Sequence, residues 1–446
     1  MRDRAFTPIA LLCAVLFLLW AVSFINFTQV KFLHLNNVDI FSDIRIKKQP
    51  KLKQIPKVIV DTITQNGKFI LPGDVTLIAD YGIDSNYSLL NFFNKLDRLK
   101  KASGKMRIAY FGDSFIEGDY VTDELRIKLQ ETYGGGGIGF LPVQSNVEGD
   151  YNYLNFKSNN SWSDKNFVNS NNINLLGLSG HVFYARGTAA TTFSIKKGLN
   201  INVVKFYTGK TNIKSPILSV VKDNNRQNVL LTNTSLVNET LINSSPIHTL
   251  KVAISESSIP VYGISMEDTA GIYIDNYGFR GNTGILTNKI TTEVMKEFQN
   301  YLKYDLIIVH YGLNAIVHGQ QKFSWFANGQ DKLIQKIKGV FPNVPILFIS
   351  TSDLGYKQNG EWITEPAVPY MVETQRSIAQ NNKVAFWDLY SSMGGENTIV
   401  SWAEGQPKLA AMDYMHLSSL GAKKVADIFY NKIMESKQYY QKSSHK

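Results

Sequence analysis

The sequence predicts an α/β protein in which a parallel sheet is covered by helices on both faces and an all-β domain interrupts the chain. Three observations support this prediction. Apolar β-type runs alternate with stretches of helical periodicity, an order that is typical of parallel sheets. One long internal segment contains only short β-type runs separated by polar turns. The chain also begins with an apolar segment of the length that a membrane span or a signal peptide requires.

The alternation of strands and helices defines the predicted sheet. The predicted strands lie near 107–111, 306–310, 346–349 and 384–389, and the predicted helices near 119–132, 330–341, 371–381 and 418–434. The first of these helices has Val121, Leu125 and Leu129 at helical spacing and precedes Gly134, a residue suited to a C-cap. Ser418 is placed to cap the last helix.

The domain organisation follows from these elements. The predicted segments are an N-terminal membrane anchor or signal segment (1–30), a basic spacer and approach helix (31–100), the first part of the α/β domain (101–147), an inserted β-sandwich or jelly roll (148–268), the second part of the α/β domain (269–436) and a polar tail (437–446). The insert is predicted from β-type runs at 201–207, 217–221, 229–231 and 250–254, which asparagine-, serine- and threonine-rich turns separate.

The N-terminal segment is apolar from Ile9 to Val22 and follows Arg2 and Arg4, which predicts a cytoplasmic N-terminus and an exported remainder. The stretch Ala21-Val-Ser23 would suit signal-peptide cleavage, but the apolar run continues to Phe27, so an uncleaved anchor is favoured; a buried core helix is the third interpretation. Cys13 is the single cysteine and lies in this segment, so the exported part is expected to fold without disulfides.

Composition limits the classes of function. The chain has 446 residues, of which 44% are hydrophobic, enough for more than one core. The formal net charge of +10 is spread along the chain without a nucleic-acid-binding motif, which argues against a nucleic-acid partner and for a mild attraction to anionic wall polymer or membrane surface. No metal site is predicted, because no metal-binding motif is present. No cofactor site is predicted either, because the Gly134–Gly139 run lacks the Gly-Lys-Ser/Thr of a phosphate loop. This run is interpreted as a flexible turn at an active-site rim.

A candidate nucleophile ends the first predicted strand, where the chain reads Gly112-Asp-Ser114. Gly and Asp are common turn residues and Ser commonly caps helices, so these three residues alone are a weak signal. Their context strengthens it, because a serine between a buried strand and a helix lies at the carboxyl edge of a parallel sheet, where α/β proteins bind ligands.

A candidate base and its partner lie about 300 residues later, in Asp413-Tyr-Met-His416. A serine hydroxyl attacks a carbonyl poorly unless an imidazole takes its proton and a carboxylate orients that imidazole. His416 would lie in the loop before the last helix, which can fold back over the same sheet edge. Ser114, His416 and Asp413 are therefore predicted to form a catalytic triad.

These blocks resemble those of the SGNH/GDSL hydrolases, and the resemblance implies a flavodoxin-like three-layer fold. It also implies that Asn314, in Tyr311-Gly-Leu-Asn-Ala315, donates its amide to an oxyanion, and that Gly281, in Gly278-Phe-Arg-Gly-Asn-Thr-Gly284, donates a backbone N–H together with that of Ser114. Ala315 stands where this family usually has an acidic residue, which leaves open how Asn314 is held.

The β insert narrows the resemblance to cell-wall O-acetylesterases that carry a carbohydrate-binding-module-like domain and act on O-acetylated peptidoglycan. The implied function is removal of O-acetyl groups from an envelope polysaccharide, with the protein on the periplasmic side of a bacterial inner membrane. The alternatives are an O-acetyltransferase that uses the same triad, a non-catalytic glycan-binding protein, and a lipid esterase, for which no apolar lid segment is evident beyond the N-terminal segment. Aromatic residues of the insert such as Trp162 and Phe183 are expected mostly in its core.

Other polar residues near the blocks have structural interpretations. His310 ends an apolar strand and is expected to be a hydrogen-bonded structural histidine, while His318 has no Asp three residues before it. Asp113 is expected to brace its turn, and Asp119 or Thr122 to cap the next helix. Arg280 is expected to bind either an anionic substrate or a local carboxylate.

Overall fold

The computed structural model describes residues 77–145, 153–170, 175–196 and 199–443. The predicted anchor or signal segment and most of the predicted spacer lie outside these ranges. Within them, no helix combines the length and the apolar character needed to cross a bilayer. The chain divides into two units. One comprises Asp74–Tyr356 and Ile363–Lys446 and holds the elements that build the site; the described part of the other is Lys357–Trp362, at the turn of a hairpin.

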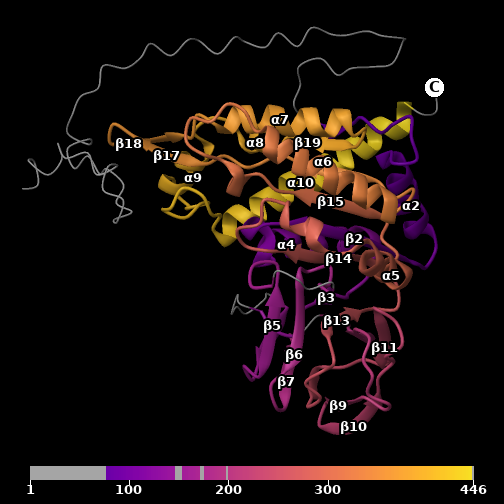
Figure 1. Ribbon diagram of the computed structural model, residues 1–446. Helices are drawn as coiled ribbons and strands as arrows, with labels where there is room; N and C mark the ends of the chain where they lie inside the picture. Colours follow the sequence, from indigo (N-terminus) through magenta and orange to yellow (C-terminus); the bar gives the residue numbers. More distant parts are fainter. Residues whose placement is uncertain (1–76, 146–152, 171–174, 197–198, 444–446) are drawn as a thin grey trace, which may run out of the picture. The chain divides into compact units, whose positions relative to one another are not determined.

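A six-stranded sheet forms the centre of the α/β part (Figure 1). Its strands lie in the order β1 (Ala79–Asp80), β19 (Ala385–Trp387), β16 (Ile346–Ile349), β15 (Leu306–His310), β2 (Lys105–Gly112) and β14 (Gly271–Gly278). The strands from β19 to β14 pair in parallel, but β1 pairs antiparallel with β19. The sheet is therefore mixed, and the prediction of an entirely parallel sheet was wrong at this edge. The two-residue β1 is too short to show a strand pattern in the sequence.

Helices cover both faces of this sheet. Successive side chains of a strand point to opposite faces, and the apolar side chains on each face are buried by the helices that pack there. One face packs on α5 (Thr292–Leu302), α6 (Ser324–Val340) and α7 (Val368–Asn381) through a core that includes Phe111 and Phe348. On the other face, the Trp387 ring stacks on Phe429 of α10 (Ser419–Ser443) with ring centroids 4.4 Å apart. Helix α10 packs in turn on α2 (Leu89–Lys101) and α4 (Tyr120–Tyr133). This is the three-layer arrangement that the sequence predicted.

Shorter elements follow the carboxyl ends of the strands. They are α3 (Ser114–Glu117), the 3₁₀ helices Leu286–Lys289 and Leu313–Ala315, the hairpin β17 (Gly355–Gln358) and β18 (Glu361–Thr364), α8 (Leu389–Met393) and α9 (Thr398–Glu404). Turns and short helices therefore lie at the carboxyl edge of the sheet. The polar side chains that they carry lie where α/β proteins bind ligands.

Two antiparallel sheets form between β2 and β14. The strand order of the first sheet is β10 (Asn225–Leu230), β9 (Ile217–Lys222), β12 (Thr249–Ile254), β7 (Ala189–Ile195) and β4 (Leu154–Ser158). The strand order of the second sheet is β11 (Asn238–Asn243), β8 (Val203–Thr208), β13 (Val261–Glu267), β6 (His181–Ala185) and β5 (Trp162–Asn166). A short strand, β3 (Gly139–Leu141), pairs with β13. The sheets share one apolar core, to which Val220 and Val252 contribute from the first and Phe206 and Ile264 from the second.

Arg107 links this β insert to the α/β sheet. Its guanidinium is buried and donates to Asp275 on β14 and to Glu267 on β13, at 2.8 Å in each case. Burial alone would raise the pKa of the Glu267 carboxyl, but Arg107 holds it well below its usual range. Strand β13 of the insert and strands β2 and β14 of the α/β sheet therefore share one buried ion network.

Two expectations about local structure were wrong. The glycine-rich turn does not lie at the active-site rim: Gly135 packs on the backbone of Gly271, which begins β14, whereas the nucleophile follows the opposite ends of the strands. Asp119 precedes α4 with a left-handed backbone (φ 60°) and caps no N–H with its side chain. Its carboxylate instead binds Arg126 at 3.0 Å, because that buried guanidinium needs an anionic partner.

Candidate active site

The nucleophile turn is built by three consecutive residues. Strand β2 ends at Gly112, Asp113 is the N-cap of α3, and Ser114 is the first residue of that helix. One carboxylate oxygen of Asp113 accepts a hydrogen bond from the backbone N–H of Phe115 at 3.0 Å. A Cβ at Gly112 would lie 2.9 Å from the Ile116 side chain and 3.1 Å from the His310 carbonyl oxygen, so glycine leaves room for this close turn from strand to helix. The turn presents Ser114 at the carboxyl edge of the sheet.

The structure brings Ser114, His416 and Asp413 together across about 300 residues of sequence. His416 Nε2 lies 3.3 Å from Ser114 Oγ, and His416 Nδ1 lies 2.7 Å from Asp413 Oδ2. A carboxylate only accepts hydrogen bonds, so Nδ1 carries the proton and Nε2 is left to accept from the serine hydroxyl. This is the arrangement of a nucleophile, a base and an orienting group.

Asp413 is held by its own loop. Its Oδ1 accepts hydrogen bonds from the backbone N–H groups of Met415 and His416, each at 3.0 Å. Partial burial raises the pKa of Asp413, but these bonds and the bond from the imidazole outweigh it and lower the pKa below 3.8. The carboxylate therefore stays charged at neutral pH. The side chains of His416 and Asp413 are 46% and 51% exposed, so the site is open to large substrates.

Asn314 lies in the 3₁₀ helix that follows β15, and its amide Nδ2 donates to Asp113 Oδ2 at 3.0 Å. The neighbouring Ala315 is buried and carries no polar group. Asp113 thus holds the amide that an acidic residue at position 315 was expected to hold. Burial raises the pKa of Asp113 to about 6, because hydrogen bonds from Phe115 and Asn314 only partly offset the loss of hydration.

Gly281 lies in the loop that follows β14, and its backbone is left-handed (φ 74°) with open space where a Cβ would be. The last residue of β14, Gly278, pairs in register with Gly112. Next to Gly281, the Arg280 backbone N–H and Nε donate to the Glu117 carboxylate at 3.3 and 3.1 Å. The loop is therefore tied to the helix that Ser114 begins, although no direct contact joins Gly281 to Ser114 or Asn314 among the described hydrogen bonds.

The other two histidines near the blocks are engaged elsewhere. His310 is buried and its Nδ1 lies 3.0 Å from the Tyr110 hydroxyl; burial lowers its pKa to about 3, so it is neutral. His318 Nδ1 lies 2.9 Å from Glu365, and its ring stacks on Tyr356 with centroids 3.8 Å apart. Arg280 pairs with a local carboxylate, one of its two expected partners.

The sequence did not identify the partners of two side chains in the site. The bond from Asp113 to Asn314 joins residues 201 positions apart, and the pair of Glu117 with Arg280 joins residues 163 apart. The sequence assigned Asp113 only to its own turn. A helix cap can be recognised from neighbouring residues, but the contact with Asn314 arises only because β2 and β15 are neighbours in the sheet. Among the residues that the structure describes, no cluster of three or more His, Cys, Asp or Glu side chains is arranged to hold a metal ion.

The three-layer α/β fold and the arrangement of Ser114, His416 and Asp413 are those expected of a serine hydrolase. Residues 265–424 match the GDSL-like lipase/acylhydrolase family, and this match to part of the chain supports a carboxylic ester hydrolase. The match begins within β13, the last strand of the insert, and the insert separates the Ser114 block from the other blocks.

Solved structures resemble the chain to different extents. A peptidoglycan O-acetylesterase is similar over 81% of this chain and 99% of its own, with a TM-score of 0.67 and 21% identity, which shows that the two share a fold. An acetylxylan esterase from Geobacillus stearothermophilus is similar over 37% of this chain and 73% of its own, with a TM-score of 0.28 and 19% identity. Comparison with curated protein sequences found no match.

Proposed function

We propose that the protein is an esterase that removes O-acetyl groups from a cell-envelope polysaccharide, with O-acetylated peptidoglycan as the substrate. The observation that carries this proposal is the hydrogen-bonded series from Asp413 through His416 to Ser114, with distances of 2.7 and 3.3 Å. The match to the GDSL-like lipase/acylhydrolase family supports ester chemistry.

In the proposed mechanism, His416 Nε2 takes the proton of Ser114 as its Oγ attacks the acetyl carbonyl carbon. The tetrahedral oxyanion is held by the backbone N–H groups of Ser114 and Gly281 and by the Asn314 amide. As the C–O bond to the sugar breaks, His416 gives its proton to the sugar oxygen and the acetyl group remains on Ser114. A water molecule, deprotonated by His416, then attacks this ester and releases acetate and free Ser114.

Asp113 and Asp413 orient the two groups that act in this mechanism. Asp413 keeps the imidazole in the tautomer that accepts the serine proton. Asp113 accepts one hydrogen of the Asn314 amide, which leaves the other hydrogen of the same nitrogen for the oxyanion. The energetic reason is preorganisation, because a donor that is already fixed need not be ordered during the reaction.

Three observations support a polymeric, acetylated glycan as the substrate. The triad is half-exposed, so an acetyl group that projects from a long chain can reach it. The protein of similar fold over 81% of this chain is a peptidoglycan O-acetylesterase. The net charge of +10 favours approach to an anionic polymer. We also propose that the apolar segment at 1–30 anchors the protein in the inner membrane, with the hydrolase on the periplasmic side.

The test compares p-nitrophenyl acetate hydrolysis by the full chain in detergent with that of Ser114→Ala and His416→Ala. Both variants are expected to lose at least roughly 10³-fold in kcat/KM, since triad members act as a unit. His248→Ala is the matched control, because this histidine is exposed on the insert and should leave turnover unchanged. Retention of turnover in either triad variant would refute the assignment.

The substrate is then tested by acetate release from O-acetylated peptidoglycan and from acetylated xylan. Faster release from peptidoglycan supports the proposal, while faster release from xylan would reassign the polymer. Acetyl transfer to an added sugar without acetate release would identify an acetyltransferase, and saturable glycan binding without turnover of any ester would identify a binding protein.

A further inference from the structure

The loops that carry Gly281 and Asn314, the expected oxyanion donors besides Ser114, follow strands that are not neighbours. The Gly281 loop follows β14 and the Asn314 turn follows β15, while β2, which leads to Ser114, lies between these two strands. Two donors hold one oxyanion only when both are fixed at the right separation before the reaction. The pairing of the strands does not join the two loops directly, so other contacts must set their separation.

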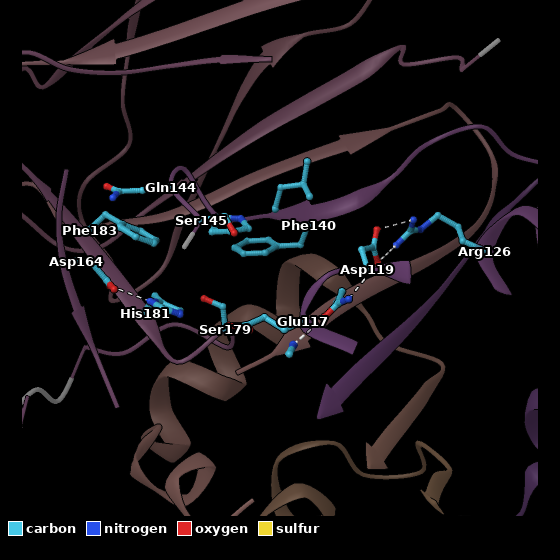
Figure 2. A pocket seen from close by; sticks show the side chains of 14 residues that line it. Glu117, Asp119, Arg126, Phe140, Gln144, Ser145, Asp164, Ser179, His181 and Phe183 are labelled. Carbon is cyan, nitrogen blue, oxygen red and sulfur yellow. Dashed lines mark hydrogen bonds and ion pairs between the residues drawn. The ribbon is translucent and has the colours of Figure 1, made fainter. Parts of the chain in front are cut away.

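The outer side of the Gly281 loop is held by an ion pair that water reaches. Arg280 Nε donates to Glu117 at 3.1 Å, and the Arg280 side chain is 73% exposed. Glu117 lines the same pocket as Asp119 and Arg126, which are bonded to each other at 3.0 Å and so do not strengthen the pair (Figure 2). An exposed ion pair contributes little, because water screens its charges and the long side chains lose conformational freedom. The ion pair alone therefore does not fix the loop.

The inner side of the loop is joined to the Asn314 turn by buried hydrogen bonds. Asn282, the neighbour of Gly281, donates from Nδ2 to Thr287 Oγ1 at 3.0 Å. Thr287 Oγ1 also lies 3.0 Å from the hydroxyl oxygen of Tyr311, the residue that follows β15. All three residues are at most 1% exposed. A bond lost here leaves an unpaired buried polar atom, so the bridge of Asn282, Thr287 and Tyr311 is held firmly.

Tyr311 carries this bridge into the Asn314 turn, because its own position leaves little freedom. Its backbone carbonyl accepts a hydrogen bond from Gln375 Nε2 at 2.5 Å, and Gln375 is fully buried on α7. A Cβ at Gly284, in the loop after β14, would lie 2.6 Å from the Tyr311 ring. The 3₁₀ helix that holds Asn314 begins two residues after Tyr311. A shift of Thr287 would therefore displace Tyr311 and, through this short link, Asn314.

Asp113 and the bridge act on different parts of Asn314. The Asp113 carboxylate accepts from the side-chain amide at 3.0 Å and sets its rotation. The bridge sets the position of the backbone from which this side chain extends. An amide can be correctly rotated and still be too far from the oxyanion, so a short hydrogen bond requires both contacts.

We propose that Thr287 is a positioning residue for the oxyanion site: its hydrogen bond to Tyr311 couples the Gly281 loop to the Asn314 turn and so places the Asn314 amide. The proposal rests on the proposed function, because it concerns a step of the same ester reaction. Thr287 and Tyr311 are buried, so they act through Asn314 and not on the substrate. A role in folding alone would change the stability of the protein but not the kcat of the molecules that are folded.

The test compares p-nitrophenyl acetate hydrolysis by the full chain in detergent with that of two variants at position 287. Thr287→Val has nearly the same shape but no hydroxyl, whereas Thr287→Ser keeps the hydroxyl. Thr287→Val is expected to lower kcat about five- to tenfold with KM within about twofold, since the oxyanion forms only in the transition state. Thr287→Ser should restore kcat to within about twofold of the wild type.

Tyr311→Phe removes the other end of the same hydrogen bond and serves as the second variant. It should lower kcat about as much, and the double variant with Thr287→Val should fall less than about twofold further, because the bond is lost only once. In Asn314→Ala, adding Thr287→Val should also change kcat less than about twofold, since the positioned donor is absent. Tyr262→Phe is the matched control, because this buried tyrosine of the insert donates to the Leu236 carbonyl at 2.9 Å and its loss should leave kcat unchanged.

Circular dichroism and thermal melts verify that each variant is folded at the assay temperature. A kcat within about twofold of the wild type in both Thr287→Val and Tyr311→Phe would overturn the positioning role, as would an undiminished loss when Thr287→Val is added to Asn314→Ala. Either result would leave the esterase standing if Ser114→Ala is inactive. An absence of wild-type turnover would instead overturn the proposed function and the positioning role together.

Discussion

Asp113→Asn separates the contribution of Asp113 to catalysis from its contribution to stability. In the wild-type protein its two carboxylate oxygens accept from the Phe115 N–H and from the Asn314 amide, each at 3.0 Å. An asparagine at 113 retains one oxygen, which can still cap α3, but it turns an NH₂ group toward the Asn314 NH₂ group. Two donors then face each other, and Asn314 is expected to rotate away from the oxyanion.

The magnitude of the stability effect follows from the pKa of Asp113. Burial raises this pKa from 3.8 to about 6. At about 1.4 kcal/mol per unit, the charged carboxylate costs the folded state about 3 kcal/mol. Because the folded-state pKa is the higher one, this cost is absent below pH 3.8, develops between pH 3.8 and about 6, and is complete above that range. The variant removes it, but the facing donors cost roughly 1–3 kcal/mol.

We therefore expect Asp113→Asn to leave the free energy of unfolding near pH 8 unchanged or raised by up to about 2 kcal/mol, and to lower kcat about 10- to 100-fold. The upper end approaches the loss of a whole oxyanion donor. The measurements are urea unfolding at several pH values and p-nitrophenyl acetate hydrolysis. The fall in stability between pH 3.8 and about 6 should be smaller in the variant.

A double-mutant cycle with Asn314→Ala provides the decisive control. If Asp113 acts through Asn314, adding Asp113→Asn to the Asn314→Ala protein should change kcat less than about twofold, since the donor is already lost. A full additional loss in the double variant, or a kcat within about threefold of wild type in Asp113→Asn alone, would refute this role.

Three further predictions concern stability and protonation. Arg107→Ala should lower the free energy of unfolding by about 3–5 kcal/mol in urea titrations, because Asp275 is left buried without its cationic partner, whereas Glu267 keeps Lys105; a loss below about 1 kcal/mol would contradict this. Hydrogen bonds lower the pKa of Asp413, so its stabilising contact with the imidazole is present above pH 3.8 and is lost only as the pH falls through the lowered pKa. The carboxyl carbon resonance of Asp413 should therefore titrate with a midpoint below 3.8. Gly421→Ala should lower the Tm by several degrees, because the added Cβ would collide with the backbone of Leu409; an unchanged Tm would show that α10 shifts freely.

Much of the α/β fold could be predicted because its signals are local. The strand expected at 306–310 is β15 (Leu306–His310), and the helix expected at 119–132 is α4 (Tyr120–Tyr133), which ends at Gly134 as its C-cap. Ser418 also caps α10, since its hydroxyl accepts from the Gly421 N–H at 3.2 Å. These elements have apolar periodicity and a terminating residue within a few positions of each other.

The parts that were missed depend on contacts distant in sequence. Helix α6 begins at Ser324, earlier than expected, because Phe323 precedes it and gives no side-chain capping signal. Strand β14 was not predicted as part of the sheet; it pairs with β2 along eight residues, and Asp275 within it is polar although fully buried against Arg107. A buried charge breaks the apolar pattern, and its partner is known only once the strands are paired.

The pairing of β3 with β13 brings the two ends of the insert together. Leu141, where the chain enters the insert, is opposite Ile264, where it leaves. The parallel pairing of β2 with β14 closes a loop of roughly 160 residues, and if the insert folds first the loop shrinks to about 30, which lowers the closure cost by about 1.5 kcal/mol. We therefore expect the β insert to form early in folding and, once folded, to hold β14 close to β2 so that the two strands can pair.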